Sequence, residues 1–183
     1  MQASSSLDIL KQKLLDCQAV KFGDFTLTSG KKSKFYVDMK LASTDPEILG
    51  LIAKEFAKNI KGKNNNIINI IDQRVFKLTP FFFSYTISKT GLYTLTKTSA
   101  ISLAPKIRVN GIAPGPTLKN KRQSEKHFKK QYLATPLKRQ VGVEQICNAV
   151  DFFIKNISIT GQVLAIDRGQ NLNWQTLDVM GKE

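Results

Sequence analysis

The chain has 183 residues, 42% of them hydrophobic and 23% charged, a composition typical of globular proteins. It contains no run of eighteen apolar residues, and its first residues lack the apolar core of a secretory signal. These features argue against a transmembrane span, and we expect a cytoplasmic protein that binds no membrane. Cys17 and Cys147 lack the spacing of metal ligands, so we expect reduced, packed thiols and no metal site.

The formal charge of +14 is concentrated in residues 117–140, which contain eight Lys and Arg residues and one Glu. Such a stretch is either a solvated surface loop or a contact for a polyanion. Phe128 and Tyr132 are the aromatic residues there that could stack on bases, which is few for a nucleic-acid site. We therefore favour a loop and expect no nucleic-acid partner. His127 has no paired nucleophile or carboxylate, and we assign it no catalytic role.

Hydrophobic periodicity and turn residues predict the following elements in chain order. A helix over 7–17 precedes a hairpin over 19–38, a helix from Pro46 to about residue 61, a strand over 66–71, a helix over 84–103, a strand over 107–112, a helix over 143–155 and a strand over 161–166. The helix after Pro46 is expected to bury Ile48, Leu49, Ile52, Ala53 and Phe56. The helix over 143–155 is expected to bury Val143, Ile146, Cys147, Val150 and Phe153.

The N-terminal region carries four motifs of one enzyme family, namely KFGDFTL at 21–27, SGKKS at 29–33, YVD at 36–38 and ASTDPE at 42–47. Over residues 7–60 it resembles the N-terminal segment of orotate phosphoribosyltransferase. The resemblance implies a hairpin that closes over orotate. That family binds phosphoribosyl pyrophosphate through adjacent acidic residues and a Thr/Gly-rich loop, and this sequence has no two adjacent acidic residues. We therefore expect the ribose-phosphate site to be absent.

Tyr85 and Lys89 lie four residues apart on a predicted helix and therefore share a face. An ammonium beside a phenol favours the ionised phenol, which makes the two residues a candidate proton-transfer pair. The alternative is an exposed amphipathic turn, because such a pair often arises by chance. The strands predicted on either side, the first of which ends at Asp72, favour the functional interpretation.

Four features after Asp72 belong together, namely Tyr85-x-x-Ser88-Lys89, the helix end at 100–105, Arg108-Val109-Asn110 and the Pro114-Gly115 turn. With them, the region from Asp72 onward resembles the C-terminal half of a short-chain dehydrogenase/reductase. The resemblance implies that Tyr85 protonates a small-molecule substrate, that Lys89 lowers the pKa of Tyr85 and holds the nicotinamide ribose of NADP or NAD, and that Asp72 orients the substrate. Pro114 and Gly115 would lie beside the nicotinamide.

Asp72 stands where most of that family has a Ser, which is similar to the pteridine reductase branch and implies a reduced-pterin or folate-related substrate. Two other features depart from the family pattern. None of the eleven glycines forms the G-x-G-x-x-G turn that receives the dinucleotide pyrophosphate, so we expect weak cofactor binding. Arg168 occupies a position where the family has Gly in an Asp-Gly-Gly turn.

We therefore predict an α/β chain with a partial Rossmann-like parallel sheet and flanking helices, preceded by a small α+β unit. The predicted domains are 1–62, similar to orotate phosphoribosyltransferase, and 63–183, similar to the reductases, joined in frame as a chimera. The incomplete sheet, and a helix face with Leu92, Leu95 and Ala100, favour a dimer or larger assembly. Three functions stay open: a weak or complemented reductase, a pyrimidine-pathway phosphoribosyltransferase relative, and an inactive remnant or interaction protein.

Overall fold

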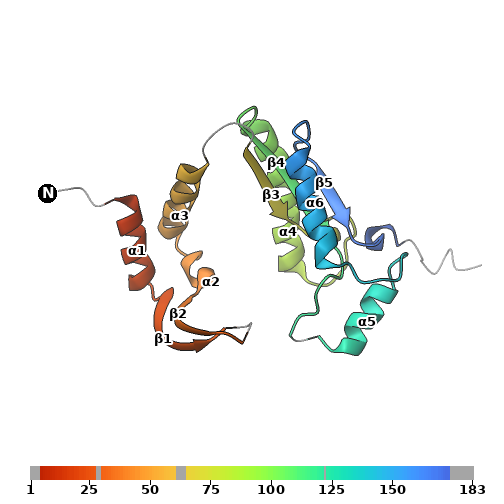
Figure 1. Cartoon of the computed structure of the whole chain (residues 1–183), viewed down its shortest axis with the longest axis horizontal. Helices are drawn as coiled ribbons and strands as arrows, with labels where there is room; N and C mark the ends of the chain where they lie inside the picture. Colours follow the sequence, from red (N-terminus) through yellow and green to blue (C-terminus); the bar gives the residue numbers. More distant parts are fainter. Residues whose placement is uncertain (1–4, 28–29, 61–64, 122, 174–183) are drawn as a thin grey trace, which may run out of the picture. The chain divides into compact units, whose positions relative to one another are not determined.

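The computed structural model describes residues 5–27, 30–60, 65–121 and 123–173. Figure 1 shows its elements along the chain. The chain forms two compact units, Met1–Gly62 and Lys63–Glu183. In the described part of the chain, none of the helices is long and apolar enough to cross a membrane.

The first unit is a small α+β arrangement, as predicted. Its elements are α1 (Ser6–Asp16), β1 (Val20–Thr26), β2 (Lys32–Val37), α2 (Met39–Ala42) and α3 (Pro46–Asn59). β1 and β2 pair antiparallel, with a bulge between Phe22 and Phe25 where Gly23 has φ +152°. Asp45 caps α3 by accepting from the amides of Glu47 and Ile48, and Pro46 occupies the first helical position.

The core of the first unit is narrow because α3 packs within the unit mainly on α1. Its buried residues are Leu10, Ala19, Ala42, Ile48 and Leu51. The predicted stripe of α3 was therefore wrong in part. Ile48 and Leu51 are buried in one cluster with Leu10 of α1, whereas Leu49 and Phe56 are 50% and 71% exposed and Ala53 is also exposed. One helix partner covers only a stripe at spacings of three and four residues, and Leu49 and Phe56 lie beside that stripe.

The second unit contains a three-stranded parallel sheet of order β3-β4-β5. Its elements are β3 (Asn65–Ile70), a 3-10 helix η1 (Gln73–Val75), α4 (Phe83–Ser102), β4 (Ile107–Pro114), α5 (Glu125–Leu133), α6 (Val143–Lys155), β5 (Val163–Ile166) and a 3-10 helix η2 (Gln170–Leu172). Ile70 pairs with Ile112, and Pro114 pairs with Ile166. The predicted partial parallel sheet with flanking helices is confirmed.

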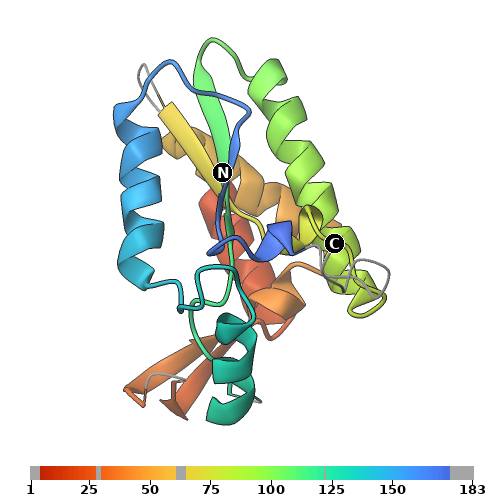
Figure 2. The same ribbon diagram turned by 90° about the vertical axis from the view of Figure 1, so that its right-hand side faces the viewer.

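Figure 2 shows α4 and α6 on opposite faces of this sheet. Ile112 of the central strand is fully buried and packs with Ala149 and Phe153 of α6. Two residues of the predicted α6 stripe were wrong, because Val143 is 51% exposed and Cys147 is also exposed. Val143 is the first residue of α6, and Cys147 lies beside the stripe of Ile146, Ala149 and Phe153 that packs on the sheet.

Arg108 and Asn110 fasten the carboxyl end of α6 to the sheet. The Arg108 guanidinium donates to the carbonyl oxygens of Phe153, Asn156 and Ile159 at 2.9 to 3.1 Å. The Asn110 side chain is fully buried; it donates to the carbonyl of Ile159 and accepts from the amide of Gln162. These contacts satisfy carbonyl groups that a helix end leaves without partners. The residues that carry the family resemblance on β4 therefore have a structural role.

The basic segment 117–140 contains a helix, so the prediction of a loop was wrong for its central part. Ser124 caps α5 by accepting from the amide of His127, and Phe128 on its inner face is only 6% exposed. Hydrogen bonds from Leu137 to Arg168, and from Val141 to Pro116, tie the chain that follows α5 to the carboxyl edge of the sheet.

Candidate functional site

The carboxyl edge of the sheet brings together the residues predicted for proton transfer. Asp72 lies two residues after the end of β3 and caps η1, while Tyr85 and Lys89 lie in the first two turns of α4. The Tyr85 hydroxyl donates to Asp72 Oδ2 at 2.7 Å. The amide of Arg74 donates to the other carboxylate oxygen at 2.8 Å. The Asp72 carboxylate thus links the turn after β3 to α4, the helix that carries Tyr85.

Asp72 is the only acidic residue between positions 56 and 124 of the sequence. Burial and the Asp72 carboxylate together raise the pKa of Tyr85 to about 12, burial being the larger cause, and the positive charge of Arg74 acts weakly in the opposite direction. The phenol is therefore protonated at neutral pH. Tyr85 in this state is a proton donor and not a base.

Lys89 does not play the part expected from its spacing. Its ammonium donates to the carbonyl oxygen of Ile70 at 2.9 Å and lies 5.8 Å from the centre of the Tyr85 ring. The expectation that Lys89 lowers the pKa of Tyr85 is thus contradicted in this structure, because burial and Asp72 raise that pKa and Lys89 is not among its causes. Lys89 instead links α4 to the end of β3.

The start of α4 is held by Arg74, a residue that sequence reasoning missed. Phe82 precedes the helix with φ +63°, and no side chain caps the helix there. The Arg74 guanidinium lies 4.7 Å from the Phe82 ring centre, and its Nη1 donates to Thr79 at 3.2 Å. The same turn therefore positions Asp72 and the helix that carries Tyr85. The left-handed conformation of Phe82 could not be predicted, because the sequence shows only a run of Phe residues at 81–83.

Pro114 and Gly115, predicted to lie beside the cofactor, end the central strand at the same edge. The amide of Gly115 donates to the carbonyl of Ile166 at 3.0 Å. A Cβ atom added at Gly115 would lie 2.7 Å from the Asp167 Cα, so the close approach of two backbones requires glycine here. This backbone packing is sufficient reason for a glycine at position 115, and no contact with a ligand is needed to account for it.

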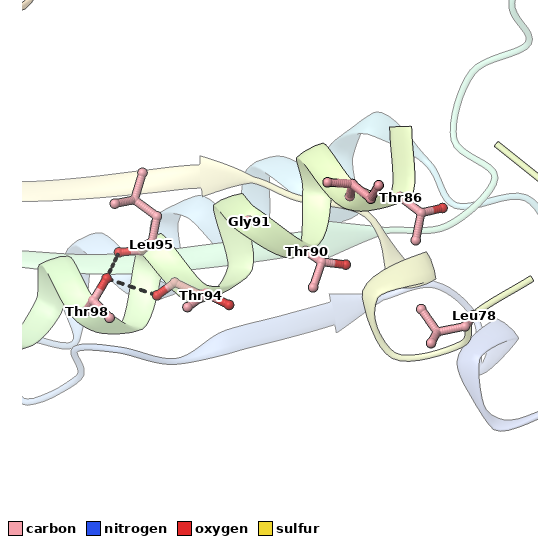
Figure 3. Close-up of a pocket in the computed structure, with 8 residues that line it drawn as sticks. Leu78, Thr86, Thr90, Gly91, Thr94, Leu95 and Thr98 are labelled. Atoms are coloured by element: carbon pink, nitrogen blue, oxygen red, sulfur yellow. Dashed lines mark hydrogen bonds between the residues drawn. The ribbon is translucent and has the colours of Figure 1, made fainter. Parts of the chain in front are cut away.

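The residues described by the structure contain no group of three His, Cys, Asp or Glu side chains that could hold a metal ion. A groove of about 720 Å³ runs along the outer face of α4, with Ile87, Gly91, Leu95 and Thr98 among its lining residues. Figure 3 shows the groove residues along the helix, with Leu78 beyond its amino end. Leu95 is exposed as expected, but Ala100 is only 4% exposed and is not available on this face, which corrects the prediction.

Comparison with known proteins relates both units to enzymes. The orotate phosphoribosyltransferase of Methanosarcina acetivorans is 49% identical over 61 residues, which are 31% of this chain and 33% of that protein. The chain thus spans about a third of the length of the curated relatives it matches. This finding supports the resemblance stated for the N-terminal segment.

Two solved structures of FolM alternative dihydrofolate reductase 1, each in complex with NADP, share the fold. The protein from Brucella suis is 39% identical with a TM-score of 0.67, and the match covers 87% of this chain and 64% of that chain. The protein from Brucella canis is 34% identical with a TM-score of 0.68, and the match covers 96% of this chain and 74% of that chain.

A family model described as enoyl-(acyl carrier protein) reductase matches residues 39–171. The match begins upstream of the predicted boundary at residue 62 and includes α3, a helix that also lies in the phosphoribosyltransferase-like stretch. The domain assignment therefore stays a prediction. With a matching parallel sheet and a family match over more than half of its length, the chain belongs to the short-chain reductase family that this model represents.

Proposed function

We propose that this chain supplies the substrate side of a reductase, with Tyr85 as the proton donor. The observation that carries the proposal is the 2.7 Å hydrogen bond from the Tyr85 hydroxyl to Asp72, in a setting that keeps the phenol protonated. A reduction needs a proton at the substrate atom next to the one that receives hydride, and a positioned neutral phenol can deliver it. Asp72 orients the phenol and is placed to bind a donor group of the substrate.

The nicotinamide cofactor would supply the hydride, and the chain fits only one end of it. Lys89 and the turn after Pro114 lie at the edge where the nicotinamide ribose is expected. For the other end, no Gly-rich turn exists to receive the pyrophosphate at a helix N-terminus. We therefore propose that the isolated chain binds NADPH with a Kd above about 1 mM, several kcal/mol weaker than a micromolar site. Micromolar binding in a fluorescence titration would contradict this.

The proposed substrate is a reduced pterin or a folate-related compound. Asp72 supports it, since a carboxylate at the strand end suits the amino and ring N–H donors of a pterin. The FolM proteins, which are named alternative dihydrofolate reductases, are similar over most of this chain. We extend their substrate class to this chain as a proposal.

The test is turnover of dihydrofolate and dihydropterin at saturating NADPH by wild type, Y85F and Y93F. Tyr93 lies on the same helix but contacts Phe76 and Lys97, so Y93F is a matched control. We expect slow turnover that Y85F lowers by about 10² or more and Y93F leaves unchanged. A complete absence of turnover, or equal losses in both variants, would overturn the reductase proposal and favour the inactive remnant.

We further propose that the α4 groove receives α4 of a second copy. Ile87 and Leu95 are 68% and 55% exposed on this face, and a Cβ at Gly91 would meet no atom within 4 Å. G91L should therefore fold normally yet block close approach of a second helix. G50L, at an equally open position of α3, is the control. Sedimentation should show a dimer for wild type and G50L and a monomer for G91L; a monomeric wild type would refute the proposal.

A second candidate function is orotate phosphoribosyl transfer, which the 49% identity of the curated relative supports. No adjacent acidic residues exist to form the expected site for phosphoribosyl pyrophosphate and its metal. We therefore expect no orotidylate when the chain is incubated with orotate, phosphoribosyl pyrophosphate and Mg²⁺. Product above a no-enzyme blank would favour this function instead.

A further inference from the structure

A pocket of about 250 Å³ lies at the carboxyl end of β5, apart from the groove along α4. Leu137 and Val141 form part of its apolar wall, and Gln145 and Arg168 supply polar groups. The pocket is smaller than the usual range for drug-sized ligands, so it suits a small molecule or one terminal group of a larger molecule. It belongs to neither the Tyr85 site nor the proposed dimer groove.

Arg168 provides a cation without a carboxylate partner. Its Nη2 lies 3.4 Å from Gln145 Oε1, a long contact, and no ion pair of Arg168 occurs among the described residues. Asp167 also lines the pocket, but its two oxygens accept from the amides of Gly169 and Asn171 at 2.9 and 2.7 Å. The lining thus contains an engaged carboxylate and an unpaired guanidinium.

The backbone at Arg168 is in the left-handed region, with φ +59°. A side chain with a Cβ is disfavoured there, and glycine would adopt this conformation without cost. Lys138 has φ +50° on the adjoining turn, whose Leu137 amide donates to the Arg168 carbonyl at 3.2 Å. Strained residues that persist at the rim of a pocket point to a function of their side chains.

The wider surroundings of the pocket are positive. Lys138 and Arg139 follow Leu137 directly and are exposed, as is Glu144, the acidic residue of the first turn of α6. Lys138 and Arg139 belong to the 117–140 segment, which as a whole holds half of the net charge of the chain. A cleft surrounded by more positive than negative charges raises the local concentration of anions.

We propose that this pocket binds an oxyanion group, a carboxylate or a phosphate, of a small ligand, and that Arg168 recognises it. A guanidinium forms directional, charge-assisted hydrogen bonds with either group, and the apolar wall limits competing water. The role of the ligand rests on the proposed function, under which the oxyanion group belongs to the substrate. The binding itself requires neither NADPH nor turnover.

The experiment is an amide NMR titration of the full chain with glutarate, with inorganic phosphate and with neutral glutaramide. We expect both anions to shift the signals of Gly169 and Gln145, and glutaramide to leave them in place. R168Q should weaken anion binding about tenfold or more. K106Q removes one positive charge from the exposed turn before β4 and should bind as wild type does. If only one of the two anions binds, that result would identify the oxyanion group as a carboxylate or as a phosphate.

R168G provides a second variant that keeps the fold, because glycine relieves the left-handed conformation. It should lose anion binding while its thermal midpoint rises. Absence of shifts, equal shifts with glutaramide, or equal binding by wild type and R168G would overturn the proposal. Binding that persists in a chain without reductase turnover would refute only the proposed function. Turnover without anion binding would refute only the pocket.

Discussion

Two parallel strands of the second unit are each followed by an Asp, and the hydrogen bonds of the two carboxylates differ in a way that bears on the catalytic role proposed for Asp72. Asp72 follows β3 and Asp167 follows β5, and each accepts a backbone N–H at the start of a 3-10 helix. Asp167 uses both oxygens for backbone amides and is 4% exposed. Asp72 uses one oxygen for an amide and offers the other to Tyr85. Under the proposed function, the oxygen of Asp72 that no backbone amide occupies is the one that acts on Tyr85 and the substrate.

The sharpest test of this comparison is the pair D72N and D167N, assayed for the proposed turnover. D72N should lower kcat by about 10² or more, because the amide presents a donor where the Tyr85 hydroxyl and the substrate need an acceptor. D167N should leave the kcat of the folded fraction within a few-fold of wild type. Equal losses of kcat in the two variants would show that both carboxylates are structural.

The same pair should separate in the opposite order when stability is measured. D167N leaves two backbone amides facing a group that can accept only through one oxygen, so we expect a loss of about 1–3 kcal/mol in the free energy of unfolding. D72N keeps an oxygen for the Arg74 amide and should cost less than about 1 kcal/mol. Urea denaturation of the two variants measures both values. A larger loss in D72N than in D167N would reverse our assignment.

The protonation of Tyr85 gives a third test, through pH. Its folded pKa of about 12 lies above the ordinary tyrosine pKa of 10.0, so the stability contributed by the neutral phenol is complete below pH 10 and is lost as pH rises towards 12. Because Tyr85 is 42% exposed, solvent screening reduces the effect to about 1 kcal/mol. Y85F should lack this loss, and Y93F should keep it. Identical alkaline denaturation of Y85F and wild type would contradict the raised pKa.

Much of the fold and part of the site could be predicted from the sequence. Periodicity located the strands and α6, since their apolar patterns are strong. The spacing of Tyr85 and Lys89 placed them on one helix face, and the resemblance to the reductases placed Asp72 with them. Their electrostatics could not be predicted in this way. The pKa of Tyr85 depends on burial and on the direction of the Asp72 carboxylate, and Lys89 turns to the Ile70 carbonyl. Both follow from tertiary packing.

The unusual backbone conformations could not be predicted from the sequence either. The Arg74 and Phe82 contact depends on a left-handed residue before α4, and a run of Phe residues does not indicate one. The outer stripe of α3 was misassigned because periodicity shows which residues share a face but not how many partners the face has. At Arg168 the sequence showed a departure from a family glycine, and the structure added that its backbone is left-handed.

That departure carries the smallest and most specific prediction. The turn after β5 places Arg168 at φ +59° and Gly169 at φ +79°, so R168G should stabilise the fold by about 0.5–1 kcal/mol through relief of the left-handed conformation, less the larger chain entropy of an unfolded glycine. G169A should act in the other direction, because its Cβ would lie 3.1 Å from Pro136 in the same region of φ. Thermal denaturation of both variants against wild type measures the difference. The turn after β3 has no residue with positive φ between Asp72 and Val75, so Q73G should only destabilise the fold. A gain in stability in Q73G equal to that in R168G would show that strain at Arg168 is not the cause.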